Sequence, residues 1–136
     1  MRFWRNHGAN KMIEGFGVDI VEVKRIRTAV KKFGARFLNK IFTKRELAYC
    51  KGKGAPEQHL AARFAAKEAV YKAFGGDGKN PIAWTDVEIV NDKYGKPLVI
   101  LKGTAKKLMA KRKVRKAVVS LSHTKNYAVG NCILLK

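Results

Sequence analysis

Hydrophobic positions recur along the chain with two periods, and each period predicts a different kind of element. Over residues 13–21 the larger apolar side chains alternate with small or polar ones, as in a β-strand with two distinct faces. One face of this strand carries Phe16, Val18 and Ile20, and the other carries Gly17, Asp19 and Val21. Over residues 22–33 the apolar side chains are three or four positions apart, which predicts an amphipathic helix that Gly34 ends.

The same reasoning extends to the rest of the chain. Thr43 and Glu46 have the spacing of a capping box, which predicts the start of a helix that continues through Tyr49. The remaining predicted elements are a helix over residues 60–74, a hairpin of strands 84–90 and 97–101, a helix over residues 104–116, and strands 117–121 and 127–135. One strand, several helices and then mostly strands indicate an α+β fold, with an antiparallel sheet packed against helices.

Alanine is the commonest residue of the predicted helix over residues 60–74, so this helix has a surface of small side chains. Such a surface lets the backbone of another element approach closely. Glu68 and Lys72 are four positions apart and share a face, with the carboxylate nearer the N-terminus. Two interpretations remain open. One is an ion pair that stabilises the helix by about 0.2–0.5 kcal/mol. The other is a metal-binding carboxylate with a phosphate-binding lysine one turn later.

With 136 residues the chain has the length of one domain, and we expect residues 12–136 to form it. Residues 1–11 are polar and basic, and we expect them to be a flexible extension outside the fold. The chain carries 30 Lys and Arg against 10 Asp and Glu, a net charge of +20. That charge indicates an anionic partner, which could be nucleic acid, an acidic protein or a phosphorylated small molecule.

The two cysteines, Cys50 and Cys132, have no CxxC spacing and no histidine in a zinc-ligand pattern. The sequence therefore predicts neither a zinc site nor a disulfide framework. No apolar run approaches the length of a membrane span, and the first eleven residues lack the apolar core of a secretory signal. These features predict a cytoplasmic protein without a membrane partner.

Two polar residues stand out against the predicted elements. Asp19 lies late in an apolar strand, where aspartate is disfavoured, and it lies near a glycine that leaves room around it. It is either a cap at the end of the strand or a functional carboxylate. His123, taken alone, is best interpreted as a structural histidine at a strand end.

Several motifs now have to be considered together. The weakest evidence for a family is the motif Gly17-Val-Asp19, which is too short to be specific alone. A much more specific motif is Arg63-Phe-Ala-Ala-Lys-Glu-Ala69 followed by Lys72. Two further motifs, Tyr94-Gly-Lys-Pro97 and Ser122-His-Thr124, follow at sequence distances that argue against coincidence. In this order they resemble the 4′-phosphopantetheinyl transferase superfamily, and within it the small bacterial branch of holo-[acyl-carrier-protein] synthases. The resemblance covers residues 13–135 and implies the fold of that superfamily.

The resemblance also implies an activity. The family transfers the 4′-phosphopantetheine group of coenzyme A to a serine of apo-acyl carrier protein in fatty acid biosynthesis, and it releases adenosine 3′,5′-bisphosphate. Asp19 and Glu68 would hold Mg²⁺, or alternatively Mn²⁺, together with oxygens of the coenzyme A pyrophosphate. Glu68 and Lys72 would be the catalytic residues. Lys72 would lie beside the pyrophosphate, and either Glu68 or a metal-bound water would accept the serine proton.

The family pattern further implies two binding surfaces and an assembly. Coenzyme A would be bound by Arg63, Lys72, Gly95, Lys96, Pro97, Ser122, His123 and Thr124. The acidic carrier protein would be bound by Lys24, Arg25, Arg27 and Arg36. Members of this branch commonly form homotrimers, in which one subunit would supply the two carboxylates and its neighbour the turn over residues 95–97 or the carrier-binding helix. One departure is Gly130, which stands where a small apolar residue is commoner.

Two other classes of function remain open. A small nucleic-acid-binding protein would fit the net charge and the basic stretch over residues 102–116. However, no RNA- or DNA-binding motif is recognisable, and most aromatic residues are at positions expected in the core. A scaffold for an acidic partner would need no chemistry. Because neither class needs a divalent-ion site, Asp19, Glu68 and Lys72 favour the enzyme, and we expect no nucleic-acid partner.

Overall fold

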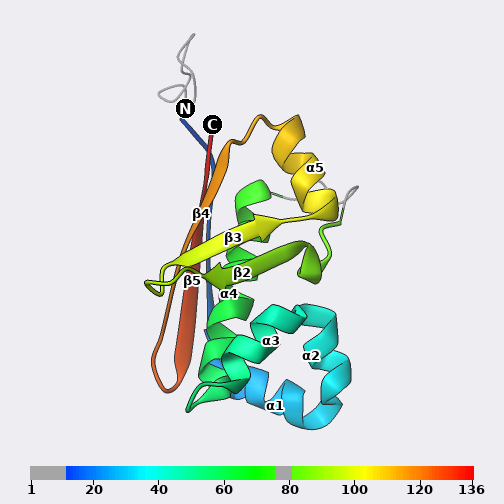
Figure 1. The fold of residues 1–136 in the computed structure, drawn as a ribbon, viewed down its shortest axis with the longest axis vertical. Coiled ribbons are helices and arrows are strands. Elements are labelled where there is room, and N and C mark those ends of the chain that lie inside the picture. Colours follow the sequence, from blue (N-terminus) through cyan, green and yellow to red (C-terminus); the bar gives the residue numbers. More distant parts are fainter. Residues whose placement is uncertain (1–11, 76–80) are drawn as a thin grey trace, which may run out of the picture.

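The computed structural model describes residues 12–75 and 81–136 (Figure 1), so the expected extension over residues 1–11 lies outside the described residues. In chain order the elements are β1 (Ile13–Glu22), α1 (Val23–Phe33), α2 (Ala35–Ile41), α3 (Lys44–Lys51), α4 (Pro56–Phe74), the short 3₁₀-helix η1 (Trp84–Asp86), β2 (Val87–Asn91), β3 (Pro97–Leu101), α5 (Gly103–Lys111), β4 (Lys116–His123) and β5 (Tyr127–Leu135).

The strands form two antiparallel sheets, which confirms the predicted α+β class. One sheet has the spatial order β1-β5-β4, and β2 and β3 form a separate hairpin. In Figure 1, α1, α2 and α3 gather at one end of the molecule and α5 lies at the other. Alanines of α4 belong to both hydrophobic clusters of the core, so α4 is the helix on which the fold is assembled. Within the described residues, no helix is both long enough and apolar enough to cross a bilayer.

Glycines of β1 and β5 let α4 approach the sheet more closely than larger residues would permit. A Cβ atom added to Gly17 would lie 2.0 Å from the carbonyl oxygen of Ala69, and one added to Gly130 would lie 2.4 Å from the backbone nitrogen of Ala66. This contact confirms the prediction that the alanine surface receives another backbone. It also explains the departure at Gly130, because no side chain fits between strand and helix there.

The outer face of the three-stranded sheet, which points away from α4, carries the apolar positions of β1. Phe16 is 60% exposed, Val18 50% and Ile20 68%. The register places Asn131 opposite Val18 and Ser120 opposite Asn131, so polar groups lie at the centre of this face. The predicted alternation is confirmed, but its larger apolar side chains point to solvent in the single chain. Although most aromatic residues were expected in the core, Phe16, Phe33, Tyr71 and Tyr127 are exposed, and Tyr94 is exposed in the predicted turn.

The helix predicted over residues 104–116 is too long. It ends at Lys111, because Lys113 adopts a positive φ of 56° and turns the chain. Val114 is buried after this turn, and the N–H of Arg115 donates to the carbonyl oxygen of Leu135 at 2.7 Å. Pairing with β5 therefore overrides the helical pattern of the basic segment.

Two other predicted boundaries are also wrong. The strand predicted from residue 84 begins at Val87, because Trp84–Asp86 form η1. The alanine-rich helix begins at Pro56 rather than at Leu60, since a proline is tolerated at the first helical position, where its missing N–H is not needed.

The predicted capping box of α3 is confirmed. The N–H of Glu46 donates to the Thr43 hydroxyl oxygen at 3.3 Å, and the N–H of Thr43 donates to Glu46 Oε1 at 2.9 Å. Glu46 Oε2 also accepts a hydrogen bond from the N–H of Ile89 at 2.9 Å. One buried carboxylate therefore joins the start of α3 to β2.

Candidate functional site

β1 and α4 bring Asp19, Glu68 and Lys72 together. Asp19 lies on the face of β1 that packs against α4, two residues after the close contact at Gly17. Lys72 Nζ lies 2.8 Å from Asp19 Oδ1 and also donates to the carbonyl oxygen of Val18 at 3.3 Å. The Asp19 side chain is 17% exposed and that of Lys72 51% exposed, so the pair is open to solvent on the lysine side.

Glu68 lies one helical turn before Lys72 and is electrostatically coupled to Asp19. Burial and then the negative charge of Asp19 raise the pKa of Glu68, while the positive charges of Lys72 and Arg25 act in the opposite direction. The hydrogen bond to Asp19 raises the pKa of Lys72, which keeps that amine protonated. The site therefore consists of two carboxylates that repel each other beside one ammonium group.

This set of donors fits a hard divalent cation. Mg²⁺ is usually held by one or two carboxylates together with water and phosphate oxygens. Asp19 and Glu68 supply two carboxylates, and the described residues contain no cluster of three or more His, Cys, Asp or Glu that would form an all-protein cage. A cation at this place would offset the repulsion that helps to raise the pKa of Glu68. Two carboxylates open to solvent are therefore the kind of donor set that Mg²⁺ takes together with water and phosphate oxygens.

Arg63 lies five residues before Glu68 and therefore points to a different side of α4. Its guanidinium donates to Asn91 Oδ1 and lies over the ring of Tyr49, 4.0 Å from the ring centre. Asn91 Nδ2 donates to the carbonyl oxygen of Gly95 at 3.0 Å. Gly95 has a positive φ of 84°, a conformation that favours glycine. Asn91 thereby connects Arg63 to the predicted binding turn, which continues with the exposed Lys96 and half-buried Pro97.

Ser122, His123 and Thr124 have different surroundings, although they are adjacent in the chain. Alternation along β4 places Ser122 on the outer face of the sheet and His123 on the face towards α4, where its ring centre is 4.7 Å from that of His59. The Thr124 hydroxyl oxygen accepts a hydrogen bond from the N–H of Tyr127 at 3.1 Å and closes the turn between β4 and β5. The structure does not bring the three side chains of this motif onto one face of the strand.

The carboxylate pair and the His123 motif lie on opposite edges of the three-stranded sheet. Asp19 pairs with Gly130 of β5 from one side, and His123 pairs with Ala128 of β5 from the other. Two strand spacings of about 4.8 Å separate β1 from β4. Within a single chain the predicted residues therefore form two groups rather than one pocket.

The predicted carrier-binding residues are exposed on the first two helices. Lys24, Arg25 and Arg27 lie on α1, and Arg36 lies on α2. Arg25 is close enough to Glu68 to lower the pKa of that carboxyl, although the net effect of its surroundings is to raise it. The basic surface therefore adjoins the carboxylate pair.

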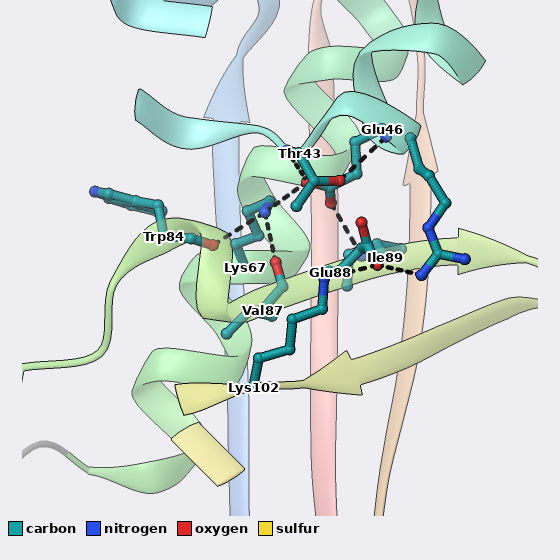
Figure 2. A network of polar contacts seen from close by, with 9 residues as sticks. Thr43, Glu46, Lys67, Trp84, Val87, Glu88, Ile89 and Lys102 are labelled. Atoms are coloured by element: carbon teal, nitrogen blue, oxygen red, sulfur yellow. Dashed lines mark hydrogen bonds and ion pairs between the residues drawn. The ribbon is translucent and has the colours of Figure 1, made fainter. Parts of the chain in front are cut away.

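Lys67, the residue before Glu68, is buried and forms an ion pair with Glu46 (Figure 2). Lys67 Nζ lies 2.7 Å from Glu46 Oε1 and donates to the carbonyl oxygens of Trp84 at 3.0 Å and Val87 at 2.5 Å. Burial lowers the pKa of Lys67, and the charge of Glu46 opposes that effect. These contacts hold the segment from η1 to β2, which lines a pocket of about 260 Å³ beside Glu68.

Glu88 extends this network on the other side of β2 (Figure 2). Its carboxylate lies 2.5 Å from Arg45 and 3.2 Å from Lys102, and its side chain is 2% exposed. Burial alone would raise the pKa of Glu88, but hydrogen bonds from Thr43, Arg45 and Lys102 outweigh it and lower the pKa to about 2. Lys102, the first residue of the basic stretch, thus has a structural role.

Sequence reasoning missed the site roles of Asn91, His59 and Lys67. Lys67 carries a signal, because it lies within the strong motif directly before Glu68. Asn91 and His59 carry no local signal, because each is defined by a contact with a residue distant in sequence.

Comparison with known proteins places these residues in a family. Residues 15–132 match the family model described as the 4′-phosphopantetheinyl transferase superfamily. A holo-[acyl-carrier-protein] synthase of Protochlamydia amoebophila is 48% identical over 117 residues, which cover 86% of this chain and 93% of that relative. The crystal structure of holo-[acyl-carrier-protein] synthase from Neisseria meningitidis has a TM-score of 0.83 and 34% identity, covering 92% of this chain and 100% of its own. The Helicobacter pylori synthase, solved in complex with coenzyme A, has a TM-score of 0.76 and 31% identity, covering 88% and 98%.

Proposed function

Because the chain belongs to the 4′-phosphopantetheinyl transferase superfamily, we propose that it transfers 4′-phosphopantetheine from coenzyme A to a serine of apo-acyl carrier protein. The observation that carries this proposal is the junction of β1 and α4, which brings Asp19, Glu68 and Lys72 together. The similar proteins are holo-[acyl-carrier-protein] synthases, and that of Helicobacter pylori was solved with coenzyme A. The biological role that follows is activation of the carrier protein for fatty acid biosynthesis.

In this reaction the serine hydroxyl oxygen bonds to the phosphorus that carries the pantetheine arm. The bond from that phosphorus to the bridging pyrophosphate oxygen breaks, and adenosine 3′,5′-bisphosphate leaves with the electron pair. The serine proton passes to Glu68, or to a water that Glu68 orients, and the raised pKa of Glu68 brings this carboxylate nearer to the working pH. Lys72 provides an ammonium group where the pyrophosphate oxygens gain charge.

Asp19 and Glu68 are the residues that would hold Mg²⁺, with Mn²⁺ as an alternative of similar ligand preference. When bound, the ion would neutralise pyrophosphate charge as a Lewis acid. Asp19 also orients Lys72 through their 2.8 Å contact. Replacing either carboxylate by a carboxamide would lower the affinity for the cation. At Asp19 it would also weaken the contact that orients Lys72.

The coenzyme A donor would contact both groups of residues. Lys72 would bind the pyrophosphate, while Arg63, the turn over residues 95–97 and the motif over residues 122–124 would bind the nucleotide end. The hydrogen bonds through Asn91 support a common role for Arg63 and the turn. The exposed cations of α1 and α2 would attract the acidic carrier protein and speed its encounter, with a rate that falls as salt increases.

We also propose that the functional unit is a homotrimer. The predicted site residues form two groups on opposite edges of one sheet. This separation is expected if each active site combines residues of two adjacent subunits. The exposed apolar side chains of Phe16, Val18 and Ile20 offer a surface for the contact. Val18→Lys should give a monomer without transfer activity, whereas Ala110→Lys, at an exposed position of α5, should leave mass and activity unchanged. Light scattering after size exclusion measures the mass.

The cytoplasm remains the expected compartment. Both cysteines of the chain, Cys50 and Cys132, are free and buried, which agrees with a reducing environment.

The test of the proposed function is the intact mass of apo-acyl carrier protein after incubation with this protein, coenzyme A and Mg²⁺. We expect a gain of one phosphopantetheine arm that a chelator prevents. Asp19→Asn and Glu68→Gln should abolish the gain while circular dichroism shows the fold retained, and Glu57→Gln, on the same helix as Glu68, should behave as the parent. No gain with several carrier proteins, or normal turnover by Asp19→Asn, would contradict the proposal.

A further inference from the structure

The last part of the chain has many basic residues and no acidic ones, because Asp92 is the last Asp or Glu of the sequence. These cations gather on α5 and the segment after it, at the end of the molecule away from α1, α2 and α3 (Figure 1). The residues proposed to bind the carrier protein lie on α1 and α2, so the proposed function gives the cations of α5 no role.

The cations of this segment divide into those that hold the fold and those that do not. Lys102 lies 3.2 Å from Glu88, and the guanidinium of Arg112 donates to the carbonyl oxygen of Phe74 at the end of α4. The other exposed cations form no ion pair with a carboxylate of residues 12–75 or 81–136. We call them the α5 cluster, and its members are Lys106, Lys107, Lys111, Lys113, Arg115 and Lys116.

The fold does not require the charges of the α5 cluster. Lys107 and Lys111 are four positions apart on one helix, a spacing at which two like charges destabilise the helix. Lys113 has a φ of 56° and is the only residue other than glycine with a positive φ in the described part of the chain. Glycine adopts this conformation without steric cost, so folding alone favours glycine at this position. A residue held in a sparsely populated conformation points to a function.

The surface of α5 lacks the apolar anchors that proteins and membranes would need. The helix buries Ala105 and Leu108 in the core and exposes Ala110 together with the lysines of the α5 cluster. Protein interfaces centre on large side chains buried in pockets, and a helix that lies on a membrane inserts an apolar face. Single-stranded nucleic acid is bound with aromatic side chains on which the bases stack. The phosphate backbone of a duplex, in contrast, is bound by lysine and arginine alone.

We propose that the α5 cluster binds the phosphate backbone of double-stranded nucleic acid without reading its sequence, as a second activity that does not depend on the transferase. The rise along α5 from Lys107 to Lys111 is about 6 Å. This is close to two phosphate steps of about 3.4 Å each along one strand of a duplex. The sequence contains no recognition motif for nucleic acid, but backbone binding requires no contact with base edges.

Fluorescence anisotropy of a short labelled DNA duplex, titrated with the protein at several salt concentrations, tests the proposal. Neutralising each phosphate contributes about 0.9 to the slope of log K against log salt. The triple variant Lys106→Gln, Lys107→Gln and Lys111→Gln should therefore make the slope shallower by about 2.7, and it should weaken binding roughly a hundredfold at about 0.1 M salt. A duplex of another sequence should bind the parent equally well.

The matched control has the same loss of charge at the other end of the molecule. Lys31→Gln, Lys32→Gln and Lys40→Gln replace exposed lysines of α1 and α2 and should leave the slope and the affinity close to those of the parent. Circular dichroism should show both triple variants folded. Lys113→Gly should make the slope shallower by about 0.9 without lowering the melting temperature, because glycine suits the backbone at that position.

The outcomes separate this proposal from the alternatives. Equal weakening by the two triple variants would mean that binding follows the net charge of +20 rather than the α5 cluster, and would overturn the inference. Tighter binding to a single strand than to the duplex would also overturn it, as would a loss of binding to apo-acyl carrier protein or anionic vesicles with duplex binding unchanged. The α5 triple variant should keep the transfer activity of the parent, so the proposed function stands or fails separately.

Discussion

Replacing Lys67 by methionine should destabilise the protein strongly, because it removes only one member of a buried ion pair. The side chains of Lys67 and Glu46 are 1% and 0% exposed. Methionine has a similar volume and leaves little empty space, but it cannot donate to Glu46 or to the carbonyl oxygens of Trp84 and Val87. Glu46 would become a buried carboxylate without a charged partner.

Removing one partner of a buried pair typically costs about 3–5 kcal/mol. For 136 residues, an unfolding entropy of about 2.1 cal/mol/K per residue gives about 0.29 kcal/mol/K. The melting temperature should therefore fall by roughly 10–17 °C. A buried carboxylate without a cationic partner costs free energy chiefly while it is ionised, so the loss of stability should be smaller at pH 5 than at pH 8.

Thermal unfolding followed by circular dichroism, at one fixed protein concentration and at both pH values, checks this prediction. Lys106→Met, at an exposed lysine of α5, is the matched control and should change the stability by less than about 0.5 kcal/mol. The double variant Glu46→Gln with Lys67→Met should lose less stability than the two single variants lose in sum, because it leaves no buried charge unpaired. Strictly additive effects, or a Lys67→Met variant that melts within a few degrees of the parent, would refute the reasoning.

Three further predictions follow from close packing and burial. Gly130→Ala should lower the melting temperature or prevent folding, because its Cβ would lie 2.4 Å from the nitrogen of Ala66, whereas Gly54→Ala, with no atom within 4 Å, should be tolerated; equal melting temperatures would contradict the close approach. Folded Glu88 has a pKa of about 2, while an unfolded glutamate titrates near 4.3, so the unfolded state binds the proton first and stability in urea should fall from about pH 4.5 to about pH 2. Glu88→Gln should flatten that part of the profile, and an unchanged slope would count against the network. Burial raises the pKa of the Cys50 thiol to about 11, so iodoacetamide should modify it far more slowly in the folded protein than in urea, as mass spectrometry would show.

Local patterns in the sequence determined most of the elements and the centre of the site. The alternation of β1 and the capping box of α3 depend on residues a few positions apart, and both are present as predicted. Glu68 and Lys72 share a face because of helical spacing alone. The family motifs predicted that both residues meet Asp19, and in the structure Lys72 contacts Asp19 directly while the charge of Asp19 acts on Glu68. The predicted end of α5 was wrong because the residues after Lys111 turn and pair with β5. The residues of the helix itself contain no signal for that pairing.

Only the tertiary structure decided which face of β1 lies inside. Local hydrophobicity favours burial of the face that carries Phe16, yet the face that carries Gly17 packs on α4. Because Gly17 and Gly130 have no side chains, the strand and helix backbones approach closely, and the alanine surface of α4 is buried. Lys67 and His59 show the same limit from the polar side. Lys67 contacts Glu46 and His59 contacts His123, and both partners are distant in the chain. The spacing of residues along one segment contains no information about a partner that folding brings into contact.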